Sequence, residues 1–272
     1  MFKYIAGNSI KHTIKCSHKV LMNNKIPIIN FAIEESTNKK KIYNEHQKLL
    51  KNLNNKHKIA IKLSSFEFDK ILLNNTIQNA SQKNIQVIID AEKGIDYDKY
   101  NDISNEIILN HNKEKCNVIK TYQMYRKDSF QALKEDSTFF SNKDIFFGTK
   151  IVRGAYWNSE NKNNYLYINK EDTDSNYNKG IIYLSENDYK TYNILATHNK
   201  ESINLGKLMN KYKEKKIFDF AHLLGMKEKL YNKIVMEGEN VHVYVPYGPY
   251  KEMLPYLFRR LYENKDTIKY IF

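Results

Sequence analysis

The chain has 272 residues, of which 41% are hydrophobic and 13% aromatic. These fractions are typical of a globular protein with a substantial core, and they exclude an intrinsically disordered chain. No apolar run reaches the roughly 18 residues that a membrane-spanning helix needs, so no transmembrane segment is expected.

The charge is strongly positive, with 44 Lys and Arg against 31 Asp and Glu, a net +13. Nucleic acid or an anionic membrane surface would be compatible with such a charge. However, the basic residues are mostly lysines scattered along the whole chain, and no recognised nucleic-acid-binding module occurs. We therefore interpret the charge as compositional bias and expect no nucleic-acid partner. Cys16 and Cys116 show no disulfide framework, which fits a reducing compartment.

Residues 1–32 contain five lysines and no acid. Transit peptides are also basic and poor in acids, but they favour Arg and Ser, whereas this segment uses Lys and runs directly into an apolar strand. We expect the segment to belong to the folded structure.

From residue 26 onward, short apolar runs alternate with segments of helical periodicity. The predicted strands are 26–32, 58–63, 85–91, 117–123, 145–154, 192–198, 217–224 and 241–247. The predicted helices are 41–53, 66–78, 100–109, 129–140, 174–184, 202–213, 227–236 and 251–262, with a polar, Asn-rich insert at 158–172. Eight strands alternating with eight helices, without an interdomain linker, predict an α/β fold: a (β/α)8 TIM-like barrel forming a single domain over residues 1–272.

In such a barrel, functional side chains lie at the carboxyl ends of the strands and in the loops that follow. These positions carry Lys62, Asp90, Gln123, the run 150–155, His198, Leu223 and Tyr244. Any one of them could be an ordinary polar loop residue, and Asp90 or His198 could serve as a cap. Taken together, these positions place several cations and few acids at one end of the barrel, its carboxyl mouth. This predicts a small anionic ligand or a phosphate-bearing cofactor.

The last predicted helix carries an adjacent pair, Arg259 and Arg260. Tyr256 and Glu263 lie three or four residues away from both and can share their face. Alone, this pattern fits a solvated salt-bridge face as well as an anion clamp roofed by tyrosine. Lys62 and Tyr244 at the same barrel mouth favour the clamp.

Other site types find no support in the sequence. It contains no GxGxxG fingerprint, P-loop, nucleophile elbow or Cys/His cluster with metal-ligand spacing, and we expect no metal. The residues alone therefore predict a barrel enzyme that acts on an anion.

Seven motifs resemble, in order, those of the proline dehydrogenase family, FAD-dependent enzymes that oxidise L-proline. They are IIDAEKG (88–94), TYQMYRKD (121–128), KIVRGAYW (150–157), ATHN (196–199), LLGM (223–226), YVPYGP (244–249) and YLFRRLYEN (256–264). YIAGNS (4–9) also resembles the family's entry into the barrel. The resemblance covers nearly the whole chain, and the wording of the motifs is closer to eukaryotic, mitochondrial-type members.

The resemblance implies a role for each matching residue. Arg259, Arg260 and Lys62 would hold the substrate carboxylate. The implied walls of the pyrrolidine ring are Tyr156, Leu223, Tyr244 and Tyr256. The implied catalytic residues are Asp90, which would orient Tyr244 or a basic neighbour, and Lys150, a cation near the flavin. The implied FAD contacts are Ala91, Gln123, Met124, Lys150, Arg153, Gly154, Ala155, Thr197, His198 and Glu263.

The implied reaction is hydride transfer from proline C5 to flavin N5, giving Δ1-pyrroline-5-carboxylate, the first step of proline degradation to glutamate. A quinone would accept the electrons, with a peripheral membrane contact at the matrix side of the mitochondrial inner membrane; a cytoplasmic location is the alternative. The chain departs from the family pattern in its Asn-rich insert and in Lys150, where bacterial members generally have Arg. Tyr256 would crowd a ring hydroxyl, so we expect proline to be preferred over hydroxyproline. A catalytically decayed barrel that acts as a binding or regulatory protein is the alternative function.

Overall fold

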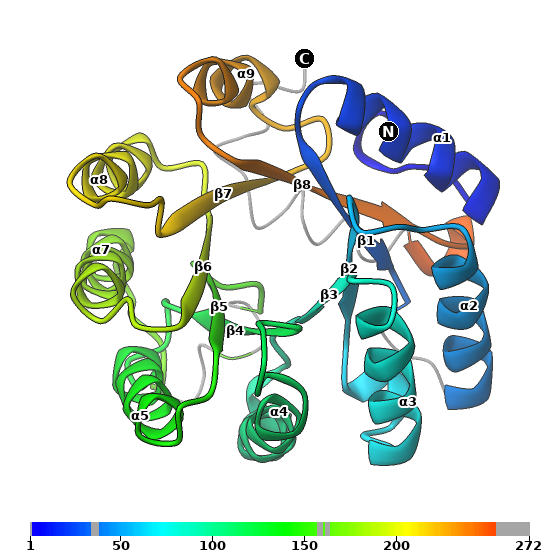
Figure 1. Cartoon of the computed structure of the whole chain (residues 1–272), viewed down its shortest axis with the longest axis horizontal. Coiled ribbons are helices and arrows are strands. Elements are labelled where there is room, and N and C mark those ends of the chain that lie inside the picture. The colour runs from blue at the N-terminus through cyan, green and yellow to red at the C-terminus, as the bar shows by residue number, and fades with distance from the viewer. Residues whose placement is uncertain (1, 34–37, 157–159, 161–163, 254–272) are drawn as a thin grey trace.

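The computed structural model describes residues 2–33, 38–156, 160 and 164–253. Eight parallel strands pair in chain order, and the last pairs with the first, so the sheet closes into a barrel. The strands are β1 (Ile26–Phe31), β2 (Lys58–Ile61), β3 (Gln86–Ile89), β4 (Val118–Gln123), β5 (Phe147–Val152), β6 (Thr191–Ala196), β7 (Phe218–Leu223) and β8 (Val241–Tyr247). The predicted (β/α)8 barrel and its eight strands are confirmed (Figure 1).

Helices surround this barrel on its outer side (Figure 1). They are α1 (Ile10–Met22), α2 (Lys39–Lys51), α3 (Lys70–Ser81), α4 (Tyr97–His111), α5 (Ser129–Asn142), α7 (Lys170–Glu186), α8 (Lys200–Lys211) and α9 (Glu228–Met236). The predicted start of α3 at residue 66 is wrong, because Ser64–Phe66 form a short 3-10 turn. Asp69 then caps α3 by accepting hydrogen bonds from the backbone N–H groups of Ile71 and Leu72. No helix in the described part of the chain combines the length and apolarity needed to cross a bilayer.

Helix α1 lies in the outer ring between α9 and α2 (Figure 1) and contacts both β1 and β8. This confirms that the basic N-terminal segment belongs to the fold. Its Val20 packs against Val243 and Val245 of β8. The turn after α1 is tied to α9 by Lys25, whose ammonium Nζ is 2.8 Å from Glu228 Oε2.

Because α1 covers β8 and β1 on the outside, the chain after β8 takes another course. Residues 250–253 are helical, and Met253 is almost fully buried against Ile5 and the end of β1 at Ala32. The predicted helix 251–262 therefore begins beside the carboxyl end of β1 and the first turn of α2, where Oε1 of Glu252 lies 3.3 Å from Nζ of Lys41; residues 254–262 lie outside the described residues.

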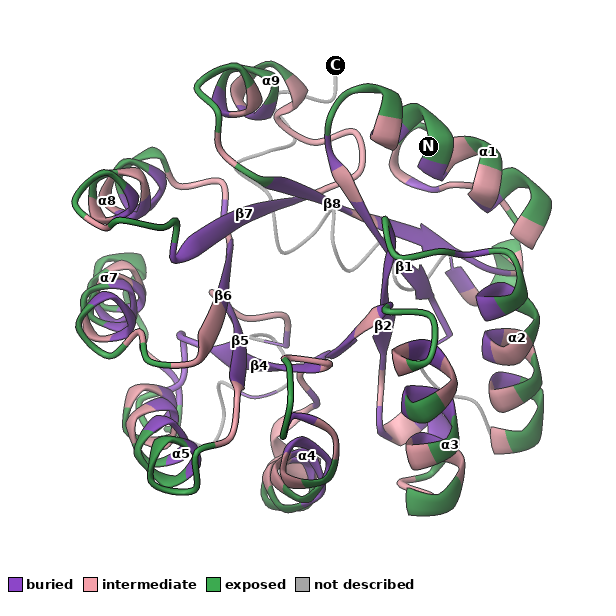
Figure 2. Ribbon diagram, viewed as in Figure 1, coloured by how far each residue is buried: buried purple, intermediate pink, exposed green. Residues whose placement is uncertain are grey.

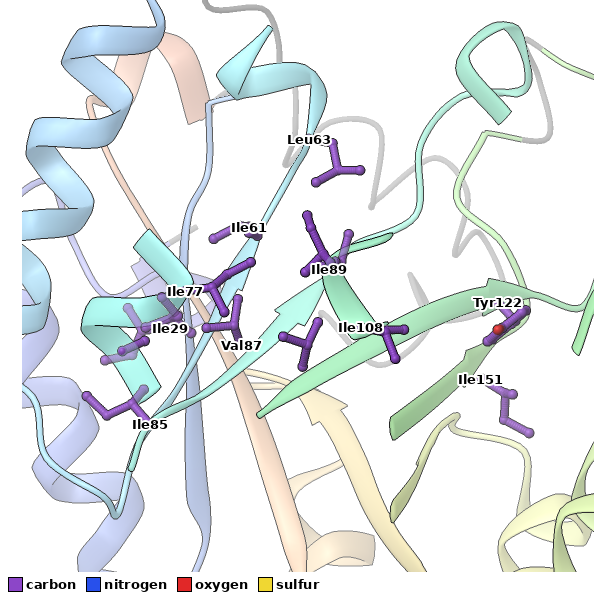
Figure 3. Close-up of a cluster of buried hydrophobic side chains, with 14 of the residues drawn as sticks. Ile29, Ile61, Leu63, Ile77, Ile85, Val87, Ile89, Ile108, Tyr122 and Ile151 are labelled. Carbon is purple, nitrogen blue, oxygen red and sulfur yellow. The ribbon is translucent and has the colours of Figure 1, made fainter. Parts of the chain in front are cut away.

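Two apolar layers hold the barrel together. Between strands and helices, side chains such as Ile29, Val87 and Ile77 of α3 form a continuous buried shell (Figure 3), and the helices expose their outer faces (Figure 2). Burying one such aliphatic side chain contributes about 1.5–3 kcal/mol. Inside the barrel a second cluster forms a middle layer from Ile28, Ala60, Ile88, Ile119, Ile194 and Ala221. Because strand side chains alternate between faces, the next inward-pointing residues lie at the mouth.

Candidate active site at the carboxyl mouth

A buried carboxylate, Asp90, connects two strands across the mouth. Its Oδ1 atom is 2.5 Å from Nζ of Lys150 on β5, and its Oδ2 atom accepts a hydrogen bond from the hydroxyl of Tyr244 on β8. Asp90 is 8% exposed and Lys150 only 4%. An ion pair this buried needs both partners, because either charge alone would be poorly solvated. The structure thus brings together three residues that the sequence predicted at one site.

A second cation lies at the end of β2. Nζ of Lys62 is 2.5 Å from the hydroxyl oxygen of Tyr156 and 5.1 Å from the centre of its ring. The same hydroxyl is 3.5 Å from the carbonyl oxygen of Ala91. Lys62 and Tyr156 therefore come from separate βα loops but form one unit.

Glu92, which the strand-end analysis did not select, supports this unit. Its carboxylate accepts hydrogen bonds from the backbone N–H and the hydroxyl of Ser64, at 2.9 and 2.8 Å. Burial raises the pKa of Glu92, and the nearby charge of Lys62 partly offsets that rise. Only its place in the IIDAEKG motif marks this residue in the sequence.

The side chain of Gln123, at the end of β4, joins the loops that follow β3 and β5. The side-chain oxygen of Gln123 accepts the N–H of Ala155 at 3.0 Å, and its amide nitrogen donates to the carbonyl oxygen of Glu92 at 3.1 Å. Gly154, the residue before Ala155, has a φ of +149°. A Cβ on Gly154 would lie 2.4 Å from the ring of Tyr125. A larger residue would have to displace that ring.

The guanidinium of Arg153 joins β5 to β6 and to two helices. Nε is 2.6 Å from Oδ1 of Asp174, Nη2 donates to the hydroxyl of Ser202 at 3.0 Å, and Nη1 donates to the hydroxyl of Thr197. Burial opposes ionisation of Asp174, but hydrogen bonds from Lys170 and Arg153 outweigh it and lower the pKa of the carboxyl. These contacts hold the guanidinium of Arg153 in place between β6, α7 and α8.

His198 stands beside Thr197 with one ring nitrogen unused. Burial, aided by the proximity of His222, lowers the pKa of His198 to about 4, so its ring is neutral near pH 7. Its Nδ1 atom is buried and has no hydrogen-bond partner within the described ranges. Buried polar atoms are normally satisfied, so this nitrogen is available to a ligand that enters the site.

The other predicted site residues fall into three groups. Leu223 ends β7 and is half-buried. Met124 is fully buried in the layer between barrel and helices, so its side chain points away from the mouth. Tyr256, Arg259, Arg260 and Glu263 lie outside the described residues.

Comparisons with known proteins agree on one family. A family model described as Proline dehydrogenase matches residues 16–270. The chain is similar to Proline dehydrogenase 1, mitochondrial, of Dictyostelium discoideum, with 32% identity over 213 residues, covering 72% of this chain and 37% of the relative. The corresponding human protein is 28% identical over 209 residues, covering 71% of this chain and 34% of its own length. The chain thus spans about a third of the length of these curated relatives.

A solved structure shares the fold. Proline utilization A from Bdellovibrio bacteriovorus, inactivated by N-propargylglycine, superposes with a TM-score of 0.89 over 96% of this chain and 32% of that chain, at 22% identity.

Proposed function

The chain belongs to the proline dehydrogenase family, and we propose that it uses FAD to oxidise L-proline to Δ1-pyrroline-5-carboxylate. The reaction removes a hydride from C5 and a proton from the ring nitrogen, leaving a C=N bond. The observation behind the proposal is that Lys62, Lys150 and Arg153 all lie at one barrel mouth. They contact Tyr156, Asp90 and Asp174, respectively. Because Lys150 and Arg153 are each paired with a carboxylate, Asp90 and Asp174, the excess positive charge that suits a substrate carboxylate and a cofactor pyrophosphate would come from Lys62 together with Arg259 and Arg260.

For the substrate, we assign Lys62 to the carboxylate, together with Arg259 and Arg260. Tyr156, Leu223, Tyr244 and Tyr256 would enclose the ring. The observation that supports this is the contact between the ammonium of Lys62 and the hydroxyl of Tyr156. If Tyr256 crowds the ring as the sequence suggests, proline is preferred over hydroxyproline.

For the cofactor, the residues present fit an anionic flavin nucleotide. Arg153 supplies a fixed charge, and Nδ1 of His198 has no partner within the described residues. Further contacts would come from Ala91, Gln123, Lys150, Gly154, Ala155, Thr197, Glu263 and the backbone of Met124. When bound, FAD supplies the two-electron acceptor that the chain's own side chains lack.

We assign the catalytic roles to Lys150 and Asp90. Lys150 forms a buried ion pair with Asp90, and its ammonium would stabilise the negative charge that the cofactor gains. Asp90 contacts both the ammonium of Lys150 and the hydroxyl of Tyr244 and would orient both for the reaction. Both act by position and charge.

We further propose that a quinone accepts the electrons and that the protein makes a peripheral contact with a membrane. The names of the eukaryotic relatives support a mitochondrial location, which we refine to the matrix side of the inner membrane.

The division of roles is tested by two measurements, the Kd for FAD and the KM for proline. We expect Lys62→Met and Arg259→Met to raise the proline KM by about tenfold or more with the FAD Kd unchanged, because each removes one charged hydrogen bond to the carboxylate. Arg153→Met should weaken FAD binding by a similar factor. Lys113→Met, at an exposed position, is the control. If Lys62→Met lost FAD and kept its affinity for proline, the assignment would be wrong.

A further inference from the structure

Glu160 is a buried carboxylate in the connection between β5 and α7, and it is 7% exposed. Its Oε1 atom accepts the backbone N–H of Gly94 at 2.5 Å, and its Oε2 atom accepts the hydroxyl of Tyr125 at 2.6 Å. Its own N–H donates to the carbonyl oxygen of Tyr156 at 3.0 Å. One side chain therefore joins the loops that follow β3, β4 and β5.

The contact with Tyr125 reaches the proposed cofactor site. The ring of Tyr125 lies directly against Gly154, where a Cβ would come within 2.4 Å of it. The backbone N–H of Tyr125 also donates to the carbonyl oxygen of Arg153 at 2.7 Å. Burial and the charge of Glu160 raise the pKa of Tyr125, so its hydroxyl keeps its proton and remains a donor. Tyr125 therefore contacts the 153–155 backbone through both its ring and its N–H.

The contact with Gly94 reaches the loop that follows β3. Gly94 follows the segment that carries Ala91 and Glu92, whose partners include Tyr156 and Ser64. A Cβ on Gly94 would lie 3.4 Å from Cδ of Glu160, so loop and carboxylate are closely packed.

Glu160 is more than a counter-ion for the nearest cation. Arg126 is already paired with Asp128, through contacts of 3.0 Å from Nε and 2.8 Å from Nη2, and it stacks on the ring of Tyr97 at 3.9 Å. Its Nη1 atom is 3.9 Å from Glu160, beyond hydrogen-bond distance. The two short contacts of Glu160 are to neutral donors, so its acceptor geometry is what the loops depend on.

We propose that Glu160 is a positioning residue for the proposed reaction: through Tyr125 and Gly94 it holds three βα loops in the arrangement that binds FAD and presents Tyr156 to the substrate. This inference rests on the proposed function. It also gives a role to the Asn-rich insert, because Glu160 and Leu166 of the insert are both buried and Leu166 bridges to Arg126.

The test compares Glu160→Ala, Glu160→Gln and Tyr125→Phe in the full chain. Removing a hydrogen bond to a charged acceptor costs about a factor of ten, so we expect Glu160→Ala to raise the FAD Kd about tenfold and to raise the proline KM as well. Glu160→Gln should stay within about threefold of wild type, because the amide oxygen can accept from Gly94 and the amide N–H can donate to the phenol oxygen of Tyr125. Glu135→Ala on the exposed face of α5 is the control.

A double-mutant cycle separates this role from general stability. Tyr125→Phe alone should weaken FAD binding about threefold to tenfold, and it should have little further effect in the Glu160→Ala background, because both changes break the same contact. If wild type binds no FAD or fails to oxidise proline, the proposed function falls. If wild type is active but Glu160→Ala keeps the wild-type FAD Kd and proline KM, this inference is overturned. Should Glu160→Ala fail to fold, an unchanged FAD Kd in Tyr125→Phe would overturn it instead.

Discussion

Asp90 supplies the negative charge that pairs with Lys150 at the barrel mouth. In Asp90→Asn, the ammonium of Lys150 would stay buried without its counter-charge, and we expect the free energy of unfolding to fall by about 3 kcal/mol. Adding Lys150→Met should recover part of this loss, because it removes the uncompensated charge. Urea denaturation of the cofactor-free proteins measures both effects.

A matched surface pair provides the control for Asp90. Asp144 is 2.7 Å from the ammonium of Lys190, but its side chain is 67% exposed. Water and salt screen such a pair, so Asp144→Asn should leave stability unchanged. Equal losses for the two Asp→Asn variants would contradict the view that burial makes the Asp90 pair essential.

Gly154 tests whether the Tyr125 ring constrains the site. Gly154 and Gly238 both have positive φ, +149° and +87°, but a Cβ on Gly238 would meet nothing closer than 3.9 Å. Gly238→Ala should therefore cost about 1 kcal/mol of strain, whereas Gly154→Ala should cost clearly more because it also displaces a buried ring. Thermal unfolding compares the two. The account is wrong here if Gly238→Ala is the more damaging change.

At this scale, the sequence predicted the residues at the strand ends but not those that hold them. Lys62, Asp90, Lys150 and His198 follow apolar runs, and the barrel places such positions at one mouth. Glu92 and Glu160 lie within loops, and their partners Ser64, Gly94 and Tyr125 come from other loops. Nothing in local periodicity records such contacts, so only the folded chain reveals them.

Among the elements, α1 was expected to be folded but was not predicted as a helix. Its buried face includes Thr13 and Ser17, whose hydroxyls donate to the carbonyl oxygens of Ser9 and Ile14 at 2.9 Å each. Because these side chains satisfy themselves within the helix, the buried face does not form an apolar stripe in the sequence. The strands, by contrast, are buried on both faces and read as continuous apolar runs.

The role of α1 as the outer cover of β8 can be tested at Val20. Val20→Asp would place a charge against Val243 and Val245, and we expect a loss of more than about 2 kcal/mol. Lys15→Gln, on the exposed face of the same helix, should change stability by less than about 0.5 kcal/mol. Chemical denaturation at one pH measures both. Equal, negligible effects would mean that α1 is not part of the cooperative fold.

On the scale of the whole molecule, buried neutral histidines link stability to pH. Burial lowers the pKa of His222 from an ordinary 6.5 to about 4, with Glu228 opposing and Lys25 reinforcing the shift. Between these two values the unfolded chain binds a proton that the folded chain does not, so the free energy of unfolding falls as the pH drops from 6.5 towards 4.

His222→Phe isolates this contribution. Phenylalanine can keep the stack on Tyr231, whose ring centre is 4.1 Å away. The variant should lose its hydrogen bonds at every pH, yet lose about 2 kcal/mol less than wild type on acidification from pH 7 to 4.5, since one unit of pKa displacement is worth about 1.4 kcal/mol. Urea denaturation at the two pH values measures the difference. Identical losses in the two proteins would contradict the prediction.

The fold as a whole was predictable because eight alternating pairs of elements have one common solution, the closed parallel barrel. The barrel interior was harder to predict from the sequence, because the inward-pointing residues at the amino end of the barrel form a buried polar network. There the carboxylate of Asp219 accepts hydrogen bonds from Tyr192 and His242. The single-domain organisation over all 272 residues stays a prediction.

The central claim is that this barrel mouth binds FAD and oxidises L-proline. The most direct measurement is the visible absorption of the FAD-loaded protein, followed without oxygen while L-proline is added. We predict that the flavin bleaches, that Lys62→Met requires a much higher proline concentration, and that hydroxyproline acts more weakly. A protein that binds FAD but keeps its full flavin absorption at saturating proline would contradict the account and favour a decayed barrel with a binding role.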